Sequence, residues 1–171
     1  MSRDDCKEIF LKKTLDLING SFSPKNLNKV LDDMNASRLN EQSYLYNKGL
    51  LADWVQFDQL GERIEDVKKY GTRRAGLIIT KYQEYFGLGE IYKLTVQPAE
   101  GCKIKINSFF AEDYFEGRYY KDYDTTLTAV VPAGKKFDCW VVNGEKVEGE
   151  ELVITPAKIV DGKTEVTCVL K

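Results

Sequence analysis

Tyr114-Phe115-Glu116-Gly117-Arg118-Tyr119-Tyr120 is the stretch of this sequence that decides the fold, and it is followed by Thr125-Thr126-Leu127-Thr128-Ala129 and Gly134-Lys135-Lys136-Phe137-Asp138-Cys139-Trp140. Short runs of alternating apolar and polar residues, separated by turn residues, are typical of β-strands. A long segment with helical spacing precedes them. We therefore expect an α+β fold, in which an N-terminal helical subdomain is followed by a small antiparallel all-β module, sandwich or barrel-like.

The strands expected beyond residue 90 are short and are separated by turn signals. The Asn-Gly and Asp-Gly pairs at 143–144 and 161–162 supply the positive φ values that tight hairpins require. Trp140 has the opposite parity to Phe137 and Cys139, which predicts that it points to the other side of its strand. The predicted strands cover residues 92–96, 102–106, 117–120, 125–131, 136–142, 151–155 and 164–170.

Two helices are expected in the first part of the chain. Apolar spacing predicts a helix over residues 4–19, which ends at Gly20. Ser23 and Pro24 predict a sharp start of the next helix, because a serine hydroxyl can cap the helix and proline suits its first turn. A weaker helix is expected to follow over residues 40–48.

A further helix is predicted before the strands begin. Asp53 is a candidate cap for it, Trp54 is expected to anchor its start, and Gly71 is expected to break it. The spacing then changes from helical to alternating near residues 87–92. The sequence therefore predicts a helical subdomain over residues 1–89 and a β module over residues 90–171.

Charge and composition exclude several classes of function. The chain has 25 basic and 27 acidic residues and a net charge of −2, so it lacks the clustered positive charge that nucleic acids or anionic membranes require of a partner. No apolar run approaches the roughly 20 residues that span a bilayer, so we expect no membrane insertion by this segment. The absence of histidine excludes Ser-His-Asp and Cys-His catalysis and every metal site that contains histidine.

The four cysteines have no metal-binding spacing. Cys102, Cys139 and Cys168 share strand parity with apolar residues, and free cysteine on such a face behaves as a small hydrophobic side chain. Buried thiols are the main expectation, and a disulfide among these three cysteines is the alternative.

No catalytic residue, cofactor-binding residue or metal ligand can be assigned from the sequence, but three groups of residues were weighed as sites. Arg73 and Arg74 are a possible anion contact, with local salt bridges as the alternative. Asp113, Glu116, Asp122 and Asp124 could contribute to a calcium site, although their spacing matches no known loop. Exposed aromatic side chains on a β module can stack on sugar rings, whereas buried ones are packing residues. The aromatic residues that fit either role are Tyr114, Phe115, Tyr119, Tyr120 and Trp140.

The order of these motifs resembles the C-terminal part of the CotH family of spore-coat-type atypical protein kinases. The resemblance rests on Arg73-Arg74 and Tyr85-Phe86-Gly87-Leu88 before the strands. It continues in Phe115-Glu116-Gly117-Arg118-Tyr119-Tyr120, Leu127-Thr128-Ala129, Gly134, Phe137 and Trp140. Its last part also resembles divergent bacterial surface repeats of the internalin B type.

The resemblance implies a non-catalytic segment that supports or positions an upstream kinase-like domain of the same parent protein. It also implies an extracellular or cell-surface location in a bacterium. No nucleotide-binding or kinase motif is present in this chain, so no activity is expected of the chain alone, although the parent could be an atypical protein kinase. The alternative is a carbohydrate-binding or adhesion module, whose partner would be a glycan or a protein at the bacterial surface.

Overall fold

The computed structural model describes residues 3–50 and 57–171, and the side chains of residues 4–50 and 63–171. It divides the chain into two compact units. Met1–Gly20 and Ile79–Lys171 form one unit, here called the sandwich unit, and Ser21–Ile78 form the other, here called the hairpin unit. The predicted α+β class, with helices first and a β module after them, is confirmed.

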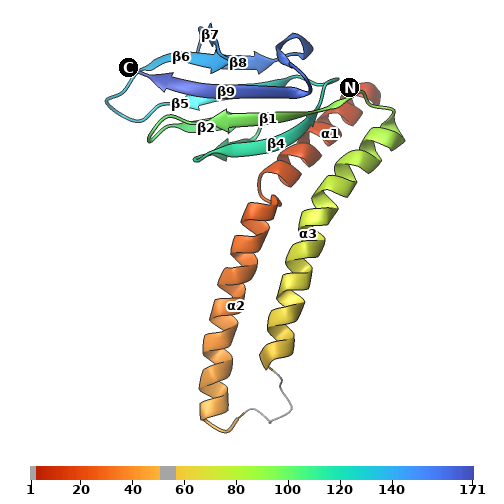
Figure 1. The fold of residues 1–171 in the computed structure, drawn as a ribbon, viewed down its shortest axis with the longest axis vertical. Coiled ribbons are helices and arrows are strands. Elements are labelled where there is room, and N and C mark those ends of the chain that lie inside the picture. Colours follow the sequence, from red (N-terminus) through yellow and green to blue (C-terminus); the bar gives the residue numbers. More distant parts are fainter. Residues whose placement is uncertain (1–2, 51–56) are drawn as a thin grey trace. The chain divides into compact units, whose positions relative to one another are not determined.

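The hairpin unit is built from α2 (Pro24–Asn47) and most of α3 (Phe57–Phe86), which run antiparallel in Figure 1. Ser23 caps α2 as predicted, and its hydroxyl accepts a hydrogen bond from the Asn26 amide at 3.4 Å. The weaker helix expected over residues 40–48 is continuous with α2, because no glycine or proline interrupts residues 25–48.

Gly71 does not break α3, which is helical on both sides of it. A Cβ atom at position 71 would lie 2.0 Å from Cδ2 of Leu27, so the glycine lets α2 and α3 approach each other. The prediction of a break is therefore wrong. The candidate cap Asp53 and the anchor Trp54 lie outside the described residues.

The sandwich unit contains two sheets that lie one above the other in Figure 1. The larger sheet has the order β4 (Phe115–Tyr120), β1 (Ile91–Gln97), β9 (Lys163–Leu170), β6 (Phe137–Val142), β7 (Glu145–Val147). The smaller has the order β3 (Phe109–Ala111), β2 (Lys103–Ile106), β5 (Thr125–Val130), β8 (Glu151–Ile154), and a short 3₁₀ turn, Pro156–Lys158, precedes β9. All the strand pairs are antiparallel except β1 and β9, which are parallel.

The core of the sandwich unit lies between the two sheets. Tyr92, Leu94 and Val96 of β1 alternate inward, and the outward residues between them are polar. The Tyr92 hydroxyl hydrogen-bonds Oγ1 of Thr125 on the other sheet at 2.9 Å. The other large buried side chains are Trp140, Tyr119, Tyr120, Ile104, Ile106, Leu127, Leu152 and Ile154.

Helix α1 (Arg3–Asn19) packs on the sandwich through Leu11, Leu15 and Ile18. At its C-terminal end, Nδ2 of Asn19 donates to the Arg118 carbonyl at 2.8 Å, and the Arg118 amide donates to Oδ1 of Asn19 at 3.1 Å. The end of α3 belongs to the same unit, since the Tyr120 hydroxyl donates to the Ile79 carbonyl at 2.7 Å. The change from helix to strand thus lies between Phe86 and Ile91, near the predicted boundary at residues 89–90, whereas the compact units are divided at residues 20–21 and 78–79.

Candidate functional site

The aromatic residues singled out in the sequence have different environments. Phe115, Tyr119, Tyr120 and Trp140 are all buried and pack inside the sandwich unit. Burial raises the pKa of Tyr120 to about 12. Tyr114, directly before β4, is 55% exposed. It is the one member of this set that an external ligand can reach.

The Phe-Glu-Gly-Arg motif has a packing explanation. A Cβ atom at Gly117 would lie 2.6 Å from Cζ of Phe115 and 3.0 Å from Cγ of Asn19. The glycine therefore makes room for the Phe115 ring and for the asparagine that joins α1 to β4. This part of the decisive stretch specifies structure rather than a ligand contact.

Trp140 points into the core together with Val142, so the face of Phe137 and Val141, which are only half-buried, is not the inward one that an outward Trp140 would require. The pairing of β6 with β9 changes register between Phe137 and Cys139, so the simple alternation from Phe137 does not continue. Cys139, Trp140 and Val142 are all buried as a result.

The arginine pair and the acidic residues do not form a recognisable site. Arg73 and Arg74 are exposed on α3, and neither forms an ion pair with a side chain that the structure describes. Asp122 accepts a hydrogen bond from the Gly89 amide at 2.6 Å, so it holds the connection between α3 and β1. Across residues 4–50 and 63–171, no group of three or more His, Cys, Asp or Glu side chains is arranged to hold a metal ion.

A buried carboxylate was not predicted from the sequence. Asp16 on α1 is 5% exposed and accepts hydrogen bonds from Nδ2 of Asn107 at 2.9 Å and from the Ser108 hydroxyl at 2.5 Å. Asn107 has a φ of 47°, which is the left-handed conformation of the tight turn between β2 and β3, and its Oδ1 accepts from the Thr126 amide at 2.9 Å. This network ties α1 to the turn, which accounts for the buried charge structurally.

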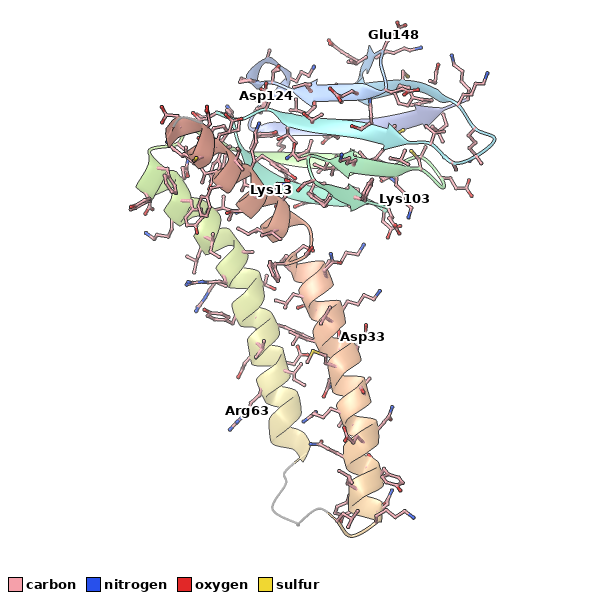
Figure 2. The ribbon with its side chains drawn as sticks, turned by 180° about the vertical axis from the view of Figure 1, so that it is seen from behind. Lys13, Asp33, Arg63, Lys103, Asp124 and Glu148 are labelled. Atoms are coloured by element: carbon pink, nitrogen blue, oxygen red, sulfur yellow. The ribbon has the colours of Figure 1, made fainter. Side chains whose placement is uncertain are left out.

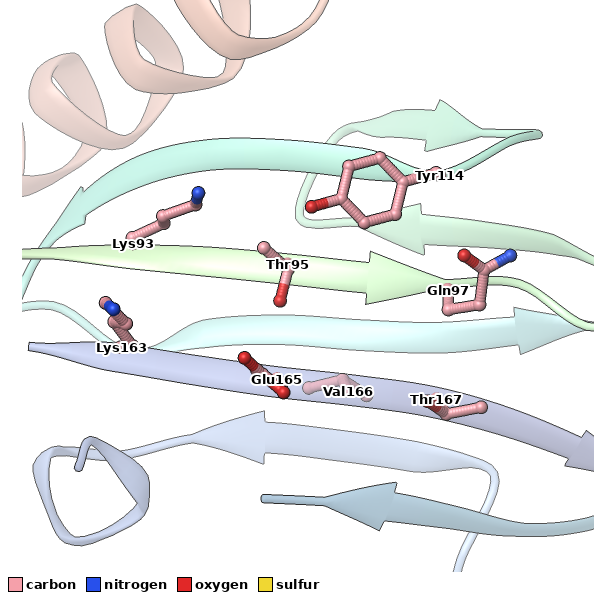
Figure 3. Close-up of a pocket in the computed structure, with 8 residues that line it drawn as sticks. All are labelled: Lys93, Thr95, Gln97, Tyr114, Lys163, Glu165, Val166 and Thr167. Atoms are coloured by element: carbon pink, nitrogen blue, oxygen red, sulfur yellow. The ribbon is translucent and has the colours of Figure 1, made fainter. Parts of the chain in front are cut away.

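A polar trough lies on the outer face of β1 and β9, with a volume of about 300 Å³ (Figure 3). Lys93 and Lys163 stand side by side at one end, while Tyr114 and Gln97 lie at the other (Figure 3). Glu165 lies between these ends. The trough is therefore cationic at one end and aromatic at the other. Its other lining residues are Thr95, Val166 and Thr167.

The trough could not be located in the sequence, because it depends on the parallel pairing of β1 with β9. The alternation of polar residues at 93, 95 and 97, and at 163, 165 and 167, was visible. No local signal in the sequence indicates that two strands so far apart in the chain pair with each other.

The hairpin unit presents a second candidate surface. Half-buried residues recur at a spacing of three and four and define the seam between the helices. On α2 this seam contains Leu27, Asn28, Leu31, Asn35, Arg38, Gln42 and Leu45, and on α3 it contains Ile64, Lys68, Gly71, Ala75 and Ile78. No residue of α2 is fully buried.

Two sides of the hairpin differ in character. Lys68 forms ion pairs with Asp32 and with Glu65, each of which directly follows a seam residue, so the charges occupy one side. Residues that directly precede seam residues on two antiparallel helices share the opposite side. Six exposed apolar side chains meet this condition and are called the apolar face: Val30, Met34, Tyr44, Val67, Tyr70 and Leu77.

The margins of the hairpin are charged. Asp33 and Arg63 point away from the seam (Figure 2). Arg63 and Arg74 also precede seam residues, so they lie beside the apolar face. Polar atoms of Asn28, Arg38 and Gln42 in the seam are buried without a hydrogen-bond partner within the described part of the chain. The hairpin unit thus has a mixed seam, in which polar side chains alternate with apolar ones such as Leu31 and Ile64, and an exposed apolar side.

The cysteines are free thiols in this structure. Cys102, Cys139 and Cys168 are buried, as the main expectation had it, and Cys6 is exposed. The Sγ atoms of Cys102 and Cys168 lie 3.8 Å apart, and burial raises the pKa of Cys168 to about 12.

Comparison with models of known protein families, with curated proteins and with solved structures found no match. The resemblance to the CotH family therefore rests on the quoted residues alone. None of the helices in residues 3–50 and 57–171 is long and apolar enough to cross a membrane.

Proposed function

We propose that this chain is a non-catalytic support segment of a CotH-like protein, in which the hairpin unit packs against an upstream kinase-like domain. The observation that carries this proposal is the apolar face on α2 and α3. Met34 is 64% exposed and Val67 is 47% exposed. Burying a fully exposed side chain of this kind is favourable by about 1.5–3 kcal/mol, so covering the exposed part of each would contribute roughly half of that. A partner surface that covered them would therefore be held firmly.

The charged residues beside the apolar face indicate what kind of partner surface would fit it. Arg63 and Arg74 flank it and form no ion pair with a described side chain. A complementary surface would be apolar at its centre and would carry carboxylates or other oxyanions at its edge, where guanidinium groups bind them well. Arg74 would then be the anion contact, made between domains rather than to a free ligand.

The kinase-like domain is the occupant that the sequence favours, because Arg73-Arg74 and Tyr85-Phe86-Gly87-Leu88 belong to the CotH resemblance. On this proposal the sandwich unit is a rigid β module that follows the kinase-like part. The parent protein would act outside the cell or at the bacterial surface.

The test is to produce the polypeptide encoded upstream of this chain in the same reading frame and to measure its binding to the full chain. We expect binding, and we expect the double variant Met34→Glu, Val67→Glu to weaken it at least tenfold, because two charges would be buried in the interface. Leu39→Glu is the matched control, since Leu39 is 38% exposed and directly follows a seam residue, on the charged side.

Two results would contradict the proposed packing against a kinase-like domain. One is an upstream reading frame that encodes no nucleotide-binding lobe. The other is binding that the double variant and the control alter equally. Phosphotransfer from ATP by this chain alone would also overturn the non-catalytic assignment.

A further inference from the structure

The register of three strands arranges the outer face of the larger sheet into rows across the strands. Lys93 of β1 pairs with Arg118 of β4 on one side and with Lys163 of β9 on the other. These three residues form a basic row. Two residues farther along β1, Thr95 pairs with Glu116 and Glu165, which places two carboxylates in the next row. The charges are therefore separated along the strands.

Two of the three basic side chains are available to a ligand. Lys93 forms an ion pair with Glu116 at 2.7 Å, and this hydrogen bond raises the pKa of Lys93. Arg118 and Lys163 form no ion pair with any side chain that the structure describes. Cations side by side repel each other unless an anion lies between them, so the basic row favours a carboxylate or sulfate group.

The far end of the trough offers a different chemistry. Tyr114 is 55% exposed, and it directly precedes Phe115, which pairs with Val96 of β1. Gln97 and Thr167 face each other beside it. An exposed ring beside amide and hydroxyl groups suits a sugar, whose C–H face packs on the ring while its hydroxyls exchange hydrogen bonds.

The length of the trough is consistent with more than one sugar ring. Lys93 and Gln97 are four residues apart on one strand, which corresponds to about 13 Å. Glu165 lies halfway, where it can accept hydrogen bonds from sugar hydroxyls. The trough has a volume of about 300 Å³ and is open to solvent, as expected of a surface that binds part of a longer chain.

We propose that this trough binds an acidic oligosaccharide of the hexuronate class, with a carboxylate held by Lys163 at the basic row and a sugar ring on Tyr114. The site goes beyond the support function and does not depend on it, since every residue involved belongs to the sandwich unit. The sequence suggested five aromatic residues that could stack on sugar rings. In the proposed site, Tyr114 is the single aromatic residue.

The experiment is a calorimetric titration of the full chain with digalacturonate, repeated with its methyl ester, which keeps the rings but removes the charges. We expect digalacturonate to bind at least tenfold more tightly than the ester, because charge-assisted hydrogen bonds to the basic row are lost. Amide NMR shifts should be confined to residues 93–97, 114–118 and 163–167.

Single-residue variants distinguish binding in the trough from unspecific electrostatic attraction to the protein surface. Lys163→Gln and Tyr114→Ala are each expected to weaken binding about three- to tenfold, through the lost anion contact and the lost stacking. Lys105→Gln, at an exposed position on the smaller sheet, removes the same charge outside the trough and should leave affinity unchanged.

The proposal is overturned if digalacturonate does not bind. It is also overturned if the ester binds equally well, or if Lys163→Gln and Lys105→Gln have the same effect. Equal binding of an acidic peptide such as tetraglutamate would assign the trough to anions in general and would overturn the assignment to sugars.

Discussion

The sandwich unit and the hairpin unit place their apolar side chains in opposite ways. In the sandwich unit, Leu94, Ile104 and Leu127 are completely buried between two sheets. In the hairpin unit, α2 has no buried residue, and polar side chains such as Asn28 and Arg38 occupy the seam while Met34 and Tyr70 are exposed. A unit with its own core can be stable alone, whereas a helix pair without one depends on what covers it.

The largest expected difference in stability comes from a leucine-to-alanine substitution made in each of the two units. Leu94→Ala should lower the free energy of unfolding by about 2–5 kcal/mol, because it leaves a cavity in a closed core. Leu77→Ala on α3, where the side chain is 43% exposed, should cost less than about 1 kcal/mol. Urea denaturation of both variants measures the difference, and similar losses would remove the distinction between the units.

Alkaline pH should selectively weaken the sandwich unit. Burial raises the pKa of Tyr92 to about 12, whereas the unfolded chain ionises near its ordinary value of 10. The unfolded state therefore loses its proton first, and stability falls as the pH rises from about 10 to 12. A shift of two pKa units corresponds to about 2.7 kcal/mol for one tyrosine.

Urea denaturation of the variant Trp54→Phe at a series of pH values, followed by the fluorescence of the buried Trp140, measures this loss. Tyr92→Phe should flatten the decline, after allowance for the lost hydrogen bond to Thr125. A stability that does not change between pH 10 and 12 would show that the phenol is not shielded from water.

Removing the buried carboxylate of Asp16 should have an intermediate effect on the free energy of unfolding. Asp16→Ala leaves Nδ2 of Asn107 without its acceptor and loosens α1 from the β2–β3 turn, which should cost about 1–3 kcal/mol. Asp33→Ala, at an exposed position on α2, should change stability by no more than about 0.5 kcal/mol. Thermal unfolding of the two variants compares them, and equal shifts would mean that Asp16 contributes no more than a surface charge.

The smallest effect is one of reactivity rather than stability. In the native protein, Cys6 should react quickly with iodoacetamide, whereas Cys102, Cys139 and Cys168 should react only after unfolding, because burial keeps the reagent away from these thiols. The raised pKa of Cys168 predicts that its alkylation stays slow up to about pH 10. Rapid modification of more than one thiol, detected by mass spectrometry, would show that the sandwich core opens readily.

The sequence predicted the strands of the sandwich unit well because their alternation is local. Residues 92–96, 102–106 and 164–170 all lie within or beside observed strands. The strands β3 and β7 were missed because three residues are too few for a period of two to be visible. The inward position of Trp140 was missed because the irregularity after Phe137 has no sequence signature.

The candidate surfaces could be predicted less well because both depend on pairing between distant segments. The trough requires β1 and β9 to be parallel neighbours, and the apolar face requires α2 and α3 to be antiparallel with a seam through Asn35 and Lys68. Val30 and Met34 are four residues apart, a spacing typical of one helical face, and in this structure both are exposed. Their helical spacing was correct, but spacing alone does not say what covers a face.

Native-state hydrogen exchange on the full chain tests the contrast between the two units most directly. If the hairpin unit lacks a core of its own, the backbone amides of α2 should exchange many times faster than those of β1 and β9, once each rate is divided into the intrinsic rate that its local sequence sets. Amides in α2 that are as strongly protected as those of β1 and β9 would contradict the account, because the helix pair would then be stable without a partner on its apolar face.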